Sequence, residues 1–141
     1  MKKIIFLILF MIAAMATLSK AQCNADLYTE QSMKSIRSGF MYEKSYRVDG
    51  RGGRKDRVEY TCILSKDTNY SFIMNSKDGG SNGMIFSLFD AKRNQVATNY
   101  VNNKFFTGIE YKCRATGIYF INFTFKNSKS HCGAAVLAFR R

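Results

Sequence analysis

The spacing of apolar residues changes once along this chain, from a helical period near residue 30 to a strand period afterwards. In residues 24–37, Tyr28, Met33 and Ile36 form a loose apolar stripe at helical spacing. The segment starts with an asparagine, a residue type that caps helices. Gly39 follows it and is a typical stop signal. The pattern predicts one short helix near the start of the domain.

After Gly39, apolar and polar residues alternate in short runs, which is the pattern of half-buried strands. The clearest run places Tyr119, Ile121 and Phe123 on one face and Asn122 on the other. The predicted strands cover residues 40–48, 58–64, 70–74, 84–89, 95–100, 105–111, 119–125 and 132–139. About eight strands at regular spacing predict an all-β fold, an antiparallel β-sandwich or jelly roll with one short N-terminal helix.

The start of the chain has the three parts of a secretory signal peptide. It begins with two lysines, continues with an apolar run over residues 4–14 and reaches a small-residue cleavage site at Ser19 and Ala21. The run is shorter than the roughly 20 residues of a membrane-spanning helix. We therefore expect a signal peptide at 1–21 and a single disulfide-containing β-sandwich domain at 22–141. The mature protein would be periplasmic or secreted, with no transmembrane segment.

Four cysteines follow the predicted cleavage site: Cys23, Cys62, Cys113 and Cys132. An even number in an exported protein favours disulfides over free thiols, so we expect two bridges. Three pairings are possible, and the sequence does not choose between them. Zinc would require close pairs such as C-x-x-C, which are absent. A lipid anchor on Cys23 is another alternative, but lipoprotein signals place a small residue before the cysteine, where this chain has Gln22.

The expected mature domain is strongly basic. The 22 basic residues include Lys2, Lys3 and Lys20, which leave with the signal peptide, so 19 face 10 acidic residues and the mature charge is about +9. Five basic residues lie within eleven positions, interrupted by three glycines: Arg47, Arg51, Arg54, Lys55 and Arg57. Guanidinium groups match phosphate and carboxylate geometry. The cluster therefore predicts binding of a polyanion.

Export narrows the partners of this basic cluster. Arg-Gly-Gly segments bind RNA in some intracellular proteins, but the segment has no stacking aromatic residue, and an exported protein rarely meets RNA. We expect no nucleic acid partner. Anionic envelope polysaccharide or lipopolysaccharide fits better, and an envelope protein is a further candidate. The alternative is a solvated, flexible hairpin tip whose charge Asp49 and Asp56 partly compensate.

Several stretches of the second half resemble the bacterial pre-peptidase C-terminal domain, a small β-sandwich appended to secreted enzymes. These stretches are LSKDTNYSF (64–72), FSLFD (86–90), QVA (95–97), IEY (109–111) and TGIYFI (116–121). The chain is similar, more broadly, to small secreted proteins of the Bacteroidota that share the cysteine- and tyrosine-rich second half. The resemblance covers most of residues 60–139 and implies a sandwich fold without catalytic residues. This chain departs from the pre-peptidase pattern by being basic, cysteine-bearing and not fused to a protease.

Residues for catalysis are sparse. His131 is the one histidine and the only candidate base near neutral pH, and no G-x-S-x-G motif marks a nucleophilic serine. Carboxylate pairs can hydrolyse glycosides without histidine. Asp56 with Glu59 and Asp67 with Asp78 are the available pairs, and their positions are typical of turns and strand edges.

These observations favour a non-enzymatic binding or accessory domain of the bacterial cell envelope. The loop at residues 77–83 is rich in oxygen-bearing side chains but has a single carboxylate, too few for calcium. We expect no cofactor and no metal. The alternatives are a cationic effector that acts on anionic envelopes and a carboxylate-based hydrolase.

Overall fold

The computed structural model describes residues 22–141, which form ten strands, one α-helix and a short 3-10 turn. In chain order these are α2 (Ala25–Lys34), β1 (Met41–Asp49), η2 (Arg51–Gly53), β2 (Arg57–Leu64), β3 (Asn69–Ser76), β4 (Met84–Phe89), β5 (Gln95–Thr98), β6 (Tyr100–Val101), β7 (Lys104–Phe105), β8 (Gly108–Lys112), β9 (Gly117–Phe125) and β10 (Cys132–Arg140). The predicted signal peptide at 1–21 lies outside the described residues. Each predicted strand is represented, and the run at 95–100 continues into a small extra hairpin, β6–β7.

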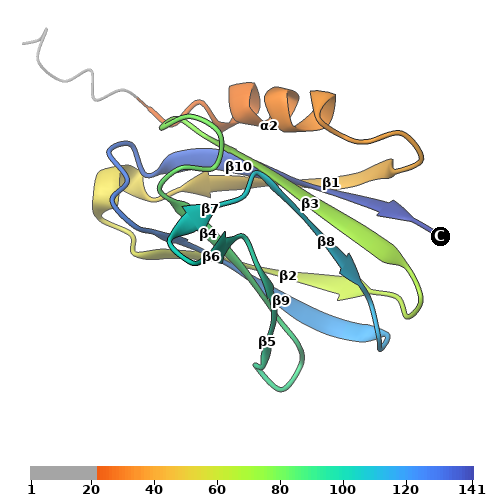
Figure 1. Ribbon diagram of the computed structural model, residues 1–141. Helices are drawn as coiled ribbons and strands as arrows, with labels where there is room; N and C mark the ends of the chain where they lie inside the picture. Colours follow the sequence, from red (N-terminus) through yellow and green to blue (C-terminus); the bar gives the residue numbers. More distant parts are fainter. Residues whose placement is uncertain (1–21) are drawn as a thin grey trace, which may run out of the picture.

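Two four-stranded antiparallel sheets face each other, and α2 covers the outer face of one of them (Figure 1). The first sheet has the order β1-β10-β3-β8 and the second β2-β9-β4-β5. The helix packs on β10, β3 and β1. The predicted all-β antiparallel sandwich with one short helix is therefore confirmed.

Neighbouring strands in the sequence often belong to opposite sheets. β1 pairs with β10 and β2 pairs with β9, so the segment between β1 and β2 crosses the end of the sandwich. The interpretation of this segment as a hairpin tip is wrong. Strand pairing is the reason: each strand is held by a partner far along the chain, as in the pairing of Asp49 with Cys132.

Aromatic side chains join the two sheets. The Phe72 ring from β3 lies 4.7 Å from the Phe86 ring of β4, and Phe86 lies 5.7 Å from Phe123 of β9, between ring centroids. All three are fully buried. The alternation predicted for residues 119–125 holds, with Ile121 and Phe123 facing the core and Phe120 on the opposite face.

Strand β10 is buried on both of its faces. Ala135 and Leu137 face the core between the sheets, whereas Ala134 and Ala138 are covered on the other side. Because α2 packs on this strand, small side chains let the helix approach closely. The small-residue composition of the last strand thus reflects its position beneath the helix.

One disulfide forms, between Cys23 and Cys132, whose Cα atoms lie 5.4 Å apart. Cys62 and Cys113 are free thiols, which corrects the expectation of a second bridge. Each thiol instead lies beside a tyrosine hydroxyl. Tyr46 neighbours Cys62, and the Tyr119 hydroxyl lies 3.5 Å from the Cys113 sulfur. Burial raises the pKa of Cys62 to about 11, so its thiol is neutral at physiological pH.

Candidate anion-binding cleft

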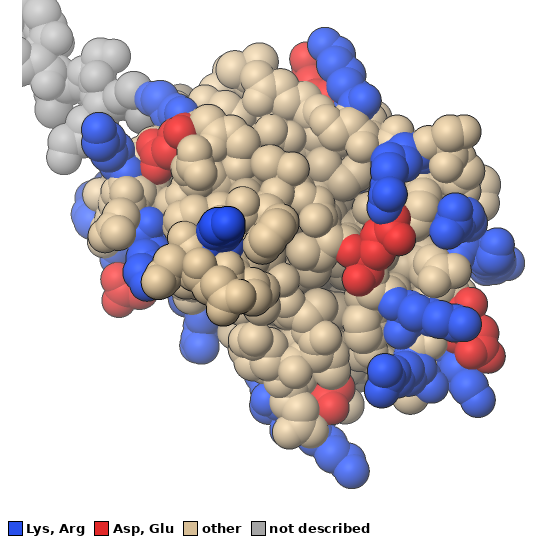
Figure 2. All heavy atoms as spheres, viewed as in Figure 1, with Lys and Arg blue, Asp and Glu red and all other residues tan. Residues whose placement is uncertain are grey.

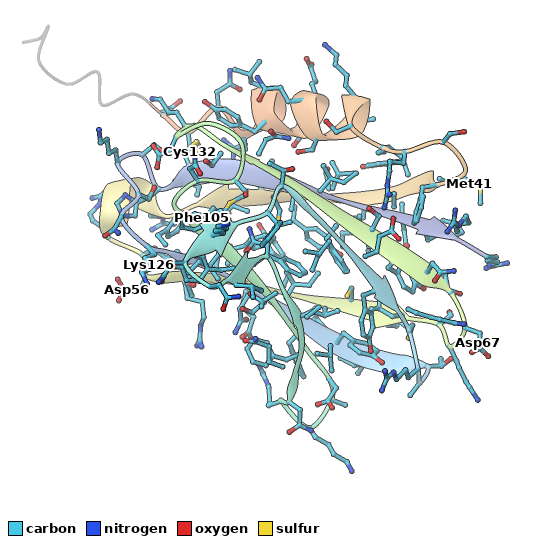
Figure 3. All side chains as sticks on the ribbon, viewed as in Figure 1. Met41, Asp56, Asp67, Phe105, Lys126 and Cys132 are labelled. Atoms are coloured by element: carbon cyan, nitrogen blue, oxygen red, sulfur yellow. A yellow bond between two sulfur atoms is a disulfide. The ribbon has the colours of Figure 1, made fainter. Side chains whose placement is uncertain are left out.

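An open cleft of about 840 Å³ lies at the end of the sandwich where three strand connections meet. These are the β1–β2, β3–β4 and β9–β10 connections, and Figure 3 shows Asp56 and Cys132 at this end, with Met41 and Asp67 at the opposite end. Five lining residues are basic and one is acidic: Arg47, Arg51, Arg54, Lys77, Lys129 and Asp49. Figure 2 shows Lys and Arg side chains around this end of the molecule. The cleft is therefore strongly cationic.

None of these five cations is in an ion pair. Within residues 22–141, the two ion pairs are Arg37 with Glu110 and Arg93 with Glu59, both outside the cleft. Asp49 is the acidic residue of the lining, and its carboxylate accepts a hydrogen bond from the backbone N–H of Arg51 at 2.8 Å. Asp49 thus shapes the turn, and the positive charge of the cleft exceeds what its own acidic group can balance.

A second cleft, of about 550 Å³, contrasts with the first. It is lined by residues of β8 and the turn before β3, and its charged groups are two acids and two bases, Asp67, Glu110, Lys112 and Arg114. Because these charges offset one another, this cleft has no comparable preference for anions.

Arg47 is held against the disulfide. It lies on β1, and its Nη2 donates to the Cys23 carbonyl at 2.8 Å. The Tyr60 hydroxyl donates to the backbone carbonyl of Arg47 from the neighbouring sheet. The remaining guanidinium N–H groups have no partner among the described residues, so they can bind a ligand in the cleft.

The turn that carries Arg51 and Arg54 is anchored at Gly50, which is buried. The backbone N–H of Gly50 donates to the His131 carbonyl at 2.8 Å, and a Cβ at Gly50 would lie 2.5 Å from the Phe125 ring. Only glycine fits this close approach. The His131 ring packs on Phe125 with centroids 5.1 Å apart. Gly50 is therefore fixed against His131 and Phe125, whereas residues 51–57 are exposed to solvent.

Lys77 and Lys129, which sequence analysis missed, form a further wall of the same cleft. Both are placed by backbone contacts: the Lys77 N–H donates to the Cys132 carbonyl at 2.8 Å, and the Lys129 N–H donates to the Asp78 carboxylate at 3.0 Å. Neither lysine belongs to a local motif. Assigning the direction of each strand would have placed both residues at the same end as the arginine segment.

Asp78 holds the β9–β10 connection in place. Its Oδ2 accepts hydrogen bonds from the Ser128 hydroxyl at 2.6 Å and the Lys129 N–H at 3.0 Å. Burial alone would raise the pKa of Asp78, but the hydrogen bonds from the 128–130 segment outweigh it and hold the pKa below its ordinary value. The ionised carboxylate is the form that anchors this wall.

The structure divides the predicted basic cluster. All five residues are exposed, but Arg47, Arg51 and Arg54 line the cleft, whereas Lys55 and Arg57 lie outside it. Arg57 is the first residue of β2 and pairs with Thr124 of β9. Lys55 and Arg57 carry the same charge outside the cleft, so variants of these two residues serve as controls for variants of the cleft residues.

The structure separates the candidate pair Asp67 and Asp78 and engages Glu59 of the other pair. Asp67 and Asp78 lie before and after β3, at opposite ends of that strand. Glu59 forms an ion pair with Arg93 at 3.1 Å. Among residues 22–141, no group of three or more His, Cys, Asp or Glu side chains could hold a metal ion. In the same part of the chain, no helix is long and apolar enough to cross a membrane.

No protein-family model and no curated protein matches this sequence. Among solved structures, the chain resembles PliG from Aeromonas hydrophila, a periplasmic lysozyme inhibitor of g-type lysozyme, with 14% identity over 75% of this chain and 90% of that one, at a TM-score of 0.44. It also resembles the pre-peptidase C-terminal domain of the Bacillus anthracis collagenase, with 14% identity over 71% and 88%, at 0.43. A Streptococcus pneumoniae fucose-binding module has 15% identity over 76% and 99%, at 0.35. At these identities and scores the similarities do not assign a ligand to this chain.

Proposed function

We propose that this protein is a secreted, non-enzymatic binding or accessory domain of the bacterial cell envelope, and that it binds an anionic ligand in the cleft at the β1–β2 end. The observation that carries the proposal is the set of five basic side chains that line one cleft without a single ion pair. Like charges held close together repel one another, and an anionic ligand relieves that repulsion. The ligand groups are phosphate, sulfate or carboxylate, as in envelope polysaccharide or lipopolysaccharide.

The chemistry of the arginines supports this choice of ligand. A guanidinium offers donors in a planar fork that matches the two oxygens of a carboxylate or phosphate. Arg47 is already oriented by its bond to the Cys23 carbonyl, and Arg54 donates to the Arg51 carbonyl through Nε at 3.2 Å. Their remaining donors are therefore partly pre-organised, which reduces the entropy lost on binding.

We also propose that the protein is located outside the cytoplasm. The Cys23–Cys132 bridge suits an oxidising compartment. Residues 1–21 have the pattern of a signal peptide. We therefore place the protein in the periplasm or outside the cell, where acidic glycans and lipid phosphates are the abundant anions.

Calorimetric titration of the exported protein with dextran sulfate, with neutral dextran as the reference, tests the proposal. Arg51→Gln with Arg54→Gln should weaken dextran sulfate binding roughly tenfold, because two charge-assisted contacts are lost. Lys55→Gln with Arg57→Gln removes the same charge outside the cleft and should change the affinity less than threefold, since neither side chain lines the cleft. Equal losses in the two variants would mean that net charge alone attracts the polymer, and the proposal would be wrong.

A further inference from the structure

We infer that the ligand of this cleft is an acidic polysaccharide chain that contacts two cationic walls, built from different connections of the fold, at once. This inference rests on the proposed function, since it names the class of anion that the same cleft takes. The arginine wall consists of Arg51 and Arg54, on the β1–β2 connection. The lysine wall consists of Lys77 and Lys129, on the β3–β4 and β9–β10 connections.

The size of the cleft calls for more than one anionic group. Its volume of about 840 Å³ lies towards the upper end of the roughly 300–1,000 Å³ that holds drug-sized ligands. A lone phosphate or sulfate is much smaller and would leave most of the cleft to water. The two walls come from different connections of the fold and together carry at least four positive charges, more than one small ion neutralises. A chain with acidic groups along its length satisfies both.

The lining disfavours an acidic peptide. Peptides bind to folded domains mainly by pairing with a strand edge or by filling apolar pockets. No aliphatic or aromatic side chain lines the cleft. Strand β1 is an edge of its sheet, but at the cleft its Arg47 carbonyl already accepts the Tyr60 hydroxyl. Main-chain pairing at this point would have to displace that bond.

Two other classes of anionic partner, single-stranded nucleic acid and a lipid bilayer, fit the lining of the cleft less well. Single-stranded nucleic acid is bound by basic grooves combined with aromatic rings that stack on the bases. The lining has no aromatic residue. A bilayer presents its phosphates on a broad surface, whereas these cations gather around a cleft.

The exposed neutral polar side chain of the lining suits a ligand rich in hydroxyl groups. Gln22 is exposed, and its amide can both donate and accept hydrogen bonds. The Ser130 hydroxyl is buried near the Asp78 carboxylate and belongs to the support of the lysine wall. Sugar hydroxyls can both donate to and accept from the Gln22 amide, whereas an ionised carboxylate can only accept.

The test compares four probes on the exported protein by calorimetry: oligogalacturonate, poly-L-glutamate with the same number of carboxylates, inorganic phosphate, and anionic phosphatidylglycerol vesicles. Oligogalacturonate should bind roughly tenfold more tightly than poly-L-glutamate, because the sugar adds hydrogen bonds to equal charge. Phosphate and vesicles should compete weakly.

Variants of each wall test whether the ligand contacts both walls. Arg51→Gln with Arg54→Gln and Lys77→Gln with Lys129→Gln should each weaken oligogalacturonate binding roughly tenfold, with Lys55→Gln and Arg57→Gln as the matched control. Far-UV circular dichroism verifies that each variant is folded. Sensitivity to one wall alone would overturn the inference that the ligand spans the cleft.

Two further outcomes separate this inference from the proposed function. If poly-L-glutamate, phosphate or vesicles bind as tightly as oligogalacturonate, and the wall variants weaken them, the cleft binds anions but does not select a glycan, and only the inference fails. If no anionic probe binds, or the wall variants have no effect on any of them, both the inference and the proposed function fail.

Discussion

The Asp78 carboxylate accepts a hydrogen bond from the Ser128 hydroxyl at 2.6 Å, across 50 residues of sequence. The Ser128 hydroxyl oxygen in turn accepts the His131 N–H at 2.9 Å, and the His131 carbonyl accepts the Gly50 N–H. The three connections that build the cleft are therefore joined by one chain of hydrogen bonds. Through this chain, a carboxylate on the connection between the two sheets is linked to the backbone of the connection that carries Arg51 and Arg54.

Replacing Asp78 by Asn should loosen the lysine wall. An amide cannot accept the Ser128 and Lys129 bonds with the strength of a carboxylate, so we expect the free energy of unfolding to fall by about 1 kcal/mol and dextran sulfate affinity to fall severalfold. Urea denaturation and calorimetry measure the two effects. Asp56→Asn makes the same charge change at an exposed residue and should alter neither. Identical behaviour of the two variants would contradict the anchoring role of Asp78.

Acid should weaken the contribution of Asp78. Because its folded-state pKa lies below the ordinary value of 3.8, the ionised carboxylate stabilises the fold fully above that value, and this contribution is lost as the pH falls through the lowered pKa. The difference in unfolding free energy between the wild type and Asp78→Asn should be constant from about pH 5 to 7 and shrink below about pH 3.8. Urea denaturation across this range measures it. A difference that grows in acid would rule out the lowered pKa.

Thiol chemistry should distinguish the two pairs of cysteines. In unreduced protein, Cys23 and Cys132 should be joined, and Cys62 and Cys113 should be unmodified thiols. Alkylation should be slow in the folded state, because Cys113 is fully buried and the pKa of Cys62 is raised to about 11. Denaturant should expose two thiols. Peptide mass mapping that finds Cys62 joined to Cys113 would contradict the free-thiol assignment.

Removing cleft charge should stabilise the protein without ligand. The five cations repel one another without ion-pair partners, so Lys77→Gln with Lys129→Gln should raise the unfolding free energy by about 0.5–1 kcal/mol at low salt. The gain should disappear at about 1 M salt, where the Debye length is about 3 Å. Lys55→Gln with Arg57→Gln should have a smaller effect. Destabilisation by the cleft variant would show that these lysines have a structural role.

Much of the secondary structure was predictable because its signals are local. Alternation at Tyr119, Ile121 and Phe123 reports which side of a strand faces the core, wherever the partner strand lies. The helix was predicted to extend through residue 37, but it ends at Lys34, where the Ser35 N–H already bonds to the Ser32 carbonyl. The β6–β7 hairpin was not predicted. Its turn residues, Asn102 and Asn103, both have positive φ, which a two-residue hairpin turn requires and asparagine tolerates.

The sequence by itself determined the strands, the single helix, the excess of positive charge and the local run of arginines, because each depends on residues a few positions apart. Only the tertiary structure decided which cysteines are joined, which sheet each strand enters, and which cations share a cleft. Lys77 and Lys129 line the same cleft as Arg51 because β3 and β9 end on the same side of the sandwich as β1. That side is set by pairing between strands distant in the sequence, such as β1 with β10. The residue pattern within a single strand does not reveal which partner it pairs with.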